Sequence, residues 1–191
     1  MRTTLSQIRA HHPCHDGWEK LLRGLGKAAA DDEPLWIDQI LDHNGLEDAL
    51  WCLRAVENCD RQIRLYAVWC ARRVQHLMTD ARSIAALDVA ERVARGEASD
   101  QELEAARGLA YSSWHAKIRL GETASAASAA SAASAAYAAV LASAPPAAAW
   151  AAAYGAAAAW PAAAGVDRDT ERAAQAEELR RVCREMREAG R

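Results

Sequence analysis

The residues best suited to chemistry lie in the stretch "HHPCHDGW", residues 11–18. It gathers three imidazoles and one thiol, from His11, His12, Cys14 and His15. Zinc binds these ligand types, but a tetrahedral site usually takes them from two separated pairs, and no second pair with that spacing follows. Pro13 can end one helix and Asp16 can cap the next, so an ordinary turn is the favoured interpretation. The four side chains are the candidate metal site of this sequence, and no cofactor is expected.

An acidic N-terminal third offers a candidate protein-binding surface. Residues 1–50 hold nine Asp and Glu against five Lys and Arg, so the net charge of −3 originates in this segment and the rest of the chain is nearly balanced. The candidate contact residues are Asp31, Asp32, Glu33, Asp38, Asp42, Glu47 and Asp48. A surface of this charge would accelerate association with a basic protein such as a nuclease. The alternative is a solvated face that has no partner.

A second charged segment, residues 59–83, mixes arginine with aromatic residues. Within it, Arg72 and Arg73 could contact a partner protein. Acidic residues such as Asp88 could instead neutralise them within the chain, because a helix that carries arginine at such spacing is most often solvated on one face.

The sequence carries no recognisable enzyme signature. Nothing places His76 or His115 beside a nucleophile, and the sequence has no glycine-rich phosphate-binding loop. Charge is nearly balanced beyond residue 50, which leaves no broad basic face for direct binding of nucleic acid. We therefore expect a binding protein without enzymatic activity.

Apolar residues recur at helical spacing in nearly every segment before residue 120, so the expected fold class is all-α. Three capping-box pairs predict helices that begin near residues 5, 17 and 100: Thr4 with Gln7, Asp16 with Glu19, and Ser99 with Glu102. Turn residues separate the segments at Gly24 and Gly26, Asn44-Gly45, 58–60 and Gly96. The pattern predicts an array of short antiparallel helices.

An uncharged tract runs from Thr123 to Val166, and 26 of its 44 residues are Ala. The high helix propensity of Ala predicts helices over 124–144 and 147–159, with Pro145-Pro146 between them. The prolines, the serines and the weakly apolar Ala disfavour a membrane span. We expect a helical core domain over 1–120, an Ala-rich helical hairpin over 121–166, and a charged C-terminal helix over 167–191 packed on the same domain.

The five cysteines are odd in number, show no CxxC spacing, and follow no apolar run of the secretory kind. They indicate reduced thiols and a cytoplasmic protein. Cys52 and Cys70 lie inside apolar helical patterns, where a free cysteine usually serves as a small buried hydrophobic residue.

Several blocks of the chain resemble one known family. They are "PCHDGWEKLL", "ILDHNGLEDALWCLRAV", the long block from "IRLYAVWCARRV" to "DQELEAAR", the Ala- and Trp-rich tract, and "AAQAEELRRVCREM". Together they are similar to the Imm-five-like immunity-protein domain, which occurs in bacteria and their prophages and is associated with polymorphic toxin systems. The most specific block is 62–104; the tract departs from the family pattern by its serines and prolines.

The resemblance implies a cytoplasmic immunity protein that binds and neutralises a cognate protein toxin. One alternative is a phage or prophage protein that inhibits a host defence complex, with a subunit of that complex as partner. Another is a small metal- or ligand-binding protein that uses the cluster at residues 11–15. The sequence specifies neither the partner nor the oligomeric state.

Overall fold

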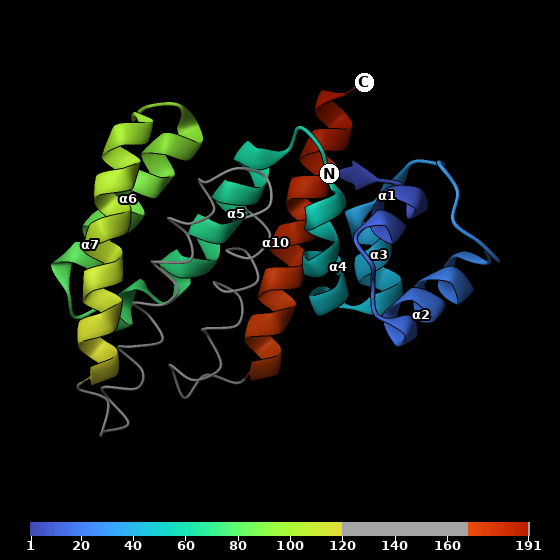
Figure 1. Ribbon diagram of the computed structural model, residues 1–191, viewed down its shortest axis with the longest axis horizontal. Helices are drawn as coiled ribbons and strands as arrows, with labels where there is room; N and C mark the ends of the chain where they lie inside the picture. Colours follow the sequence, from blue (N-terminus) through green and yellow to red (C-terminus); the bar gives the residue numbers. More distant parts are fainter. Residues whose placement is uncertain (120–167, 191) are drawn as a thin grey trace. The chain divides into compact units, whose positions relative to one another are not determined.

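The computed structural model describes residues 1–119 and 168–190, and these residues are predominantly helical (Figure 1). The all-α fold class predicted from the sequence is confirmed. A small departure is an antiparallel ladder of two-residue strands, β1 (Arg2–Thr3) and β2 (Leu35–Trp36), in which Arg2 pairs with Trp36. Two-residue strands are too short to leave an alternating pattern in the sequence. The Ala-rich hairpin expected over 121–166 lies outside the described residues.

The chain forms two compact units. Unit 1 comprises Met1–Cys59 and Arg172–Arg191, and unit 2 comprises Asp60–Glu171. A core domain over 1–120 is predicted from the sequence, and the boundary between the two units falls within that range, between Cys59 and Asp60. The C-terminal helix also starts in unit 2 and continues in unit 1.

Unit 1 is built from short helices and the end of a long one. Its elements after β1 are α1 (Leu5–Ala10), α2 (His15–Leu25), β2, α3 (Ile37–Asn44), α4 (Leu46–Cys52), the 3-10 turn η1 (Leu53–Ala55) and most of α10 (Arg168–Ala189). Helix α3 packs against both α2 and α4. Fully buried side chains from five of these elements fill the interior: Leu5, Ile8, Ile37, Ile40, Leu50, Leu53 and Leu179.

The helix ends of unit 1 confirm one N-cap predicted from the sequence and correct another. Thr4 caps α1 as expected, since its hydroxyl accepts the backbone N–H of Gln7 at 3.1 Å. The expected start of α2 near residue 17 is wrong, because the helix begins at His15 with Cys14 as its N-cap. Asp16 therefore lies in the first turn, where its charge still favours the helix dipole. Gly26 ends α2 in the left-handed conformation with φ of 67°, which glycine adopts without strain.

Unit 2 contains α5 (Asp60–Arg73), the 3-10 turn η2 (Gln75–Leu77), α6 (Ala81–Arg95), α7 (Asp100–Arg119) and the first turn of α10. Helix α6 packs against both α5 and α7. The core they share is rich in small residues: Val68, Ala71, Val74, Met78, Ala86, Leu87, Ala90, Leu103, Ala106 and Ala110. Alanine at the contact positions lets the helix backbones approach closely, and Leu87 and Leu103 supply bulk.

Cys70 in unit 2 and Cys52 in unit 1 are buried, which confirms their expected role as small hydrophobic residues.

Replacing Ser99 with Ala should raise the pKa of Glu102, which is about 2 in the native protein. The backbone N–H of Ser99 donates to this carboxylate at 2.9 Å, Arg92 donates at 2.7 Å, and the hydroxyl of Ser99 lies at 3.0 Å. The substitution removes the hydroxyl, and with it the cap that holds the Glu102 backbone N–H. A carbon-13 NMR titration of the Glu102 carboxyl group measures the change.

The lowered pKa of Glu102 also determines how the stability of the fold depends on pH. Because the pKa of Glu102 lies below its ordinary value of 4.5, the ionised carboxylate stabilises the fold above about pH 4.5, and this contribution is lost as the pH falls toward 2. The control is Ser112→Ala, which removes a hydroxyl that donates to Gly108 in the same helix and should leave the pKa of Glu102 unchanged. An unchanged pKa in Ser99→Ala would show that the hydroxyl of Ser99 does not contribute to it, since the backbone N–H of residue 99 still donates to Glu102.

Candidate functional site

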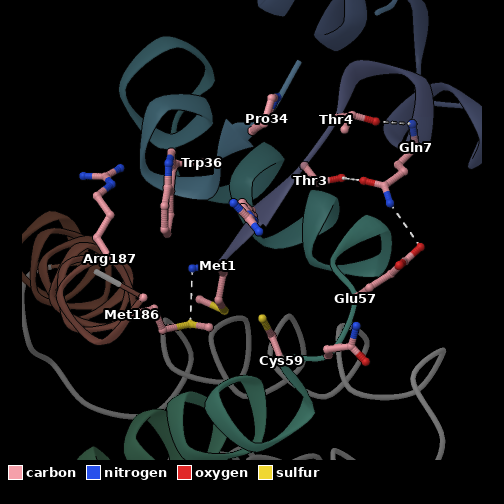
Figure 2. A pocket seen from close by; sticks show the side chains of 13 residues that line it. Met1, Thr3, Thr4, Gln7, Pro34, Trp36, Glu57, Cys59, Met186 and Arg187 are labelled. Carbon is pink, nitrogen blue, oxygen red and sulfur yellow. Dashed lines mark hydrogen bonds between the residues drawn. The ribbon is translucent and has the colours of Figure 1, made fainter. Parts of the chain in front are cut away.

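A groove of about 630 Å³ lies on the surface of unit 1. Its walls come from β1 and the start of α1, from Pro34 and Trp36, from the segment 57–59, and from the last turn of α10 (Figure 2). This volume lies within the range of ligand-binding pockets in proteins. Four segments distant in sequence therefore build one concave surface.

One wall of the groove combines an aromatic ring with a fixed cation. The guanidinium carbon of Arg187 lies 4.4 Å from the ring centroid of Trp36, in cation–π geometry. The same guanidinium donates to both carboxylate oxygens of Asp38, at 2.6 and 2.9 Å. Because the ring and the carboxylate both hold Arg187, the wall is ordered before any partner arrives.

Sulfur-containing side chains form the next part of the surface. Met1, Met186 and Cys59 all line the groove, and Figure 2 shows their sulfur ends directed toward the same region. The backbone nitrogen of Met1 lies 3.2 Å from Sδ of Met186. Met1 and Cys59 are buried, whereas Met186 is half-buried, so its flexible and polarisable side chain is the one that can adapt to the shape of an apolar partner group.

The opposite wall is polar and is also internally ordered. The side-chain amide of Gln7 donates to Glu57 at 3.0 Å, and its oxygen lies 3.1 Å from the hydroxyl of Thr3. That hydroxyl is closer, at 2.6 Å, to the carbonyl of Ala55. Figure 2 shows Gln7 between Thr3 and Glu57. The groove thus offers aromatic and thioether surfaces on one side and hydrogen-bonding groups on the other, a composition typical of protein interfaces.

Most of the seven candidate acidic residues pair with cations of unit 1. Lys27 contacts both Asp31 and Glu33, the latter at 2.7 Å. These hydrogen bonds raise the pKa of Lys27, and the bond from Lys27 lowers the pKa of Asp31. Asp32 is exposed and makes no ion pair in the described part of the chain.

The remaining four acids lie on α3 and α4, and three of them form ion pairs with arginines of helix α10. Three ion pairs join them: Asp38 with Arg187, Asp42 with Arg180, and Glu47 with Arg172. The pair of Arg180 with Asp42 raises the pKa of Arg180. Asp48 differs, because its carboxylate accepts a hydrogen bond from Asn44 at 2.8 Å and makes no ion pair among the described residues. Much of the acidic surface expected to meet a basic partner is therefore neutralised within the chain.

The two candidate arginines of unit 2 are paired as well. Arg72 donates to Asp88 and to Glu91, each at 2.7 Å, so the internal neutralisation by Asp88 considered from the sequence is present. Arg73 forms a two-point pair with the buried Glu171, with both contacts at 2.5 Å. Neither guanidinium is free to act as an isolated cation.

The histidine and cysteine cluster does not converge on one point. His15 reaches Glu19 at 3.2 Å, whereas the thiol of Cys14 lies beside Gly17 at a separate small cleft. His11 ends α1, and His12 adopts a φ of 54° in the turn that follows. Among the side chains described, no three His, Cys, Asp or Glu residues come together in a way that could hold a metal ion.

Sequence reasoning missed Trp36, Arg187 and Met186 as members of a site. Trp36 follows Pro34-Leu35 outside any helical pattern, and an aromatic residue in such a turn is a usable signal. Arg187 and Met186 belong to an ordinary charged helix, and nothing local marks them.

Comparison with protein-family models, with curated proteins and with solved structures finds no match to this chain. Within residues 1–119 and 168–190, no helix has both the length and the apolar character needed to cross a membrane.

Proposed function

We propose that this chain is a non-enzymatic binding protein that neutralises a cognate protein toxin, and that the groove of unit 1 receives a segment of that partner. The groove carries the proposal, because Trp36, Arg187 and Met186 combine the residue types that dominate binding energy at protein interfaces. Its two walls are ordered by internal contacts, so little side-chain entropy is lost on binding. The choice of a toxin as the partner rests on the resemblance of the sequence blocks to Imm-five-like immunity domains, for which no family model gives a match.

The pairing of the acidic residues refines the expected mode of binding. Asp38, Asp42 and Glu47 already meet arginines of α10, so a basic partner would have to compete with intramolecular ion pairs. The pairs of Asp42 and Glu47 have exposed carboxylates, so they contribute little energy and are screened by salt, whereas the half-buried pair of Asp38 with Arg187 belongs to the groove wall. We therefore infer that contact in the groove, more than long-range charge attraction, supplies the affinity.

Affinity capture from the native host tests this proposal. The tagged protein should retain one stoichiometric partner at moderate salt, and mass spectrometry identifies it. Expression of that partner alone should arrest growth, and co-expression with this chain should restore it. A captured subunit of a host defence complex would replace toxin neutralisation with counter-defence.

Substitutions in the groove localise the contact. Trp36→Ala should weaken binding of the identified partner by about tenfold or more, the effect of losing a hot-spot aromatic residue. Pro34→Glu adds a charge at an exposed groove position and should weaken binding without affecting the core. The matched control is Tyr111→Ala, since Tyr111 is an exposed aromatic residue of unit 2, 46% accessible. Equal affinity of all three variants and the native chain would exclude the groove.

A further inference from the structure

A second, smaller hollow in unit 1 has a chemistry that the groove does not share. This cleft of about 50 Å³ lies between α2, α3 and α4, and its lining includes Gly17, Trp18, Asn44, Asp48, Trp51 and Cys52. A cavity needs roughly 10–15 Å³ to hold one water molecule, so the cleft has room for a small group and not for a large side chain.

Asn44, one of the residues that line the cleft, has a buried acceptor atom without a partner among the described residues. The side-chain amide of Asn44 uses its two N–H groups on the backbone carbonyl of Gly17 and on Asp48, each at 2.8 Å. These bonds fix the orientation of the amide, because turning it over would set its oxygen against two other acceptors. Its oxygen Oδ1 is buried and has no hydrogen-bond partner in the described chain. Buried acceptors are nearly always paired, so this one requires a donor from outside the chain, which a water molecule or a ligand can supply.

Asp48 adds a negative charge at the same place. It is the one carboxylate among the lining residues and makes no ion pair in the described part of the chain. Burial and the charge of Asp48 raise the pKa of Cys52 to about 12, so this lining thiol stays neutral near pH 7. The nearby ammonium of Lys20 donates instead to the backbone carbonyl of Asn44, at 3.1 Å. A locked amide oxygen and a carboxylate without a cation thus meet in a space of a few water volumes.

The surroundings of the cleft restrict the ligand further. Arg9 lies over the ring of Trp18 at 5.4 Å, and Arg54 lies over the ring of Trp51 at 3.8 Å. These two cations would repel a second positive charge on the ligand. A primary ammonium is about the size of a water molecule, so it fits within the volume of the cleft.

We propose that the cleft formed by Asn44, Asp48, Trp18 and Trp51 binds the ammonium end of a single-charged alkyl chain, as a lysine side chain presents it. The ammonium donates to Asn44 Oδ1 and to the carboxylate of Asp48, and its last methylenes contact the indole rings. That this lysine belongs to a partner protein rests on the proposed function. The binding of an alkylammonium ion in the cleft does not depend on it.

Titration of the complete protein with n-butylammonium chloride tests the site without any partner. The indole N–H signals of Trp18 and Trp51 and the side-chain amide signals of Asn44 should shift and saturate in nitrogen-15 NMR spectra. n-Butanol, of similar shape but uncharged, should bind at least about tenfold more weakly, since a hydrogen bond to a charged group is worth more than a neutral one. Equal binding of n-butanol, or shifts that never saturate, would overturn the proposal.

Two variants and one control assign the effect to the cleft. Asp48→Asn keeps an acceptor for Asn44 but removes the charge, and should weaken butylammonium binding about tenfold. Gly17→Ala places a Cβ 3.1 Å from both Asp48 Oδ2 and Cys14 Sγ, and should weaken binding while its better helix propensity supports the fold. Glu47→Gln removes the neighbouring charge, which pairs with Arg172 outside the lining, and should leave binding unchanged.

A final comparison separates the two sources of such an ammonium. Putrescine carries a second charge four carbons away, which would approach Arg9 or Arg54, so it should bind more weakly than n-butylammonium. Tighter binding of putrescine would make the cleft a polyamine site and would overturn its assignment to lysine. This outcome is independent of the capture experiment, in which the groove variant Trp36→Ala is decisive.

Discussion

Arg73→Met should lower the free energy of unfolding of unit 2 by about 3 kcal/mol, the loss expected when one partner of a buried ion pair is removed. The side chain of Glu171 is only 2% exposed and would be left as an unpaired buried carboxylate. Arg73 also lies over the ring of Trp69, at 5.0 Å, so its removal opens that contact too. Methionine retains the length and much of the apolar stem, which isolates the effect of the charge.

The two side chains of this pair differ in exposure, so the two single substitutions should differ in cost. The side chain of Arg73 is 38% exposed, so after Glu171→Gln the guanidinium can turn to water, and the cost should be only about 1 kcal/mol. The double variant Arg73→Met with Glu171→Leu removes both charges and should recover most of the loss. Amide hydrogen exchange in α5 and α6 measures unit 2 separately from unit 1.

The exposed pair of Arg107 with Glu104 provides the control in the same unit. Its side chains are 36% and 72% exposed, and Arg107→Met should change the stability by no more than about 0.5 kcal/mol. If Glu171→Gln cost more than Arg73→Met, the carboxylate would not be the buried partner whose desolvation controls the energy.

Local features of this fold could be predicted from the sequence because their causes are local. Ser99 and Glu102 are three residues apart, and the capping box they form depends on nothing else. The left-handed ends of α2 and α6 follow from Gly26 and Gly96 in the same way. Helix α2 begins two residues before the predicted start, because Asp16 and Glu19 have the spacing of a capping box although both lie inside the helix.

The site could not be predicted, because it depends on contacts between distant residues. Arg187 meets Asp38 across 149 positions, and Arg180 meets Asp42 across 138. Counted along the sequence, these acids form a charged run that suggests a partner surface; in the fold, α10 neutralises them. The orphaned oxygen of Asn44 is equally invisible in sequence, since the amide is oriented in part by its bond to Gly17, which only the packing of α2 on α3 creates.

Leu87→Ala should destabilise unit 2 by about 3 kcal/mol, within the range for a buried leucine. Leu87 on α6 is completely buried in a core in which five of the nine other buried members are alanines. Alanine has no side-chain length with which to move into the space left behind, so the cavity should persist and the full cost should appear.

Leu109→Ala on the neighbouring helix α7 removes the same atoms from an exposed position, where the loss should barely change the stability. Leu109 is 46% exposed, so its loss should alter the free energy of unfolding by no more than about 0.5 kcal/mol. Hydrogen exchange of the amides in α6 and α7 measures both variants on one scale. A loss in Leu109→Ala as large as that in Leu87→Ala would mean that the outer face of α7 is covered in solution. Because both variants remove the same atoms, the difference between them measures burial alone.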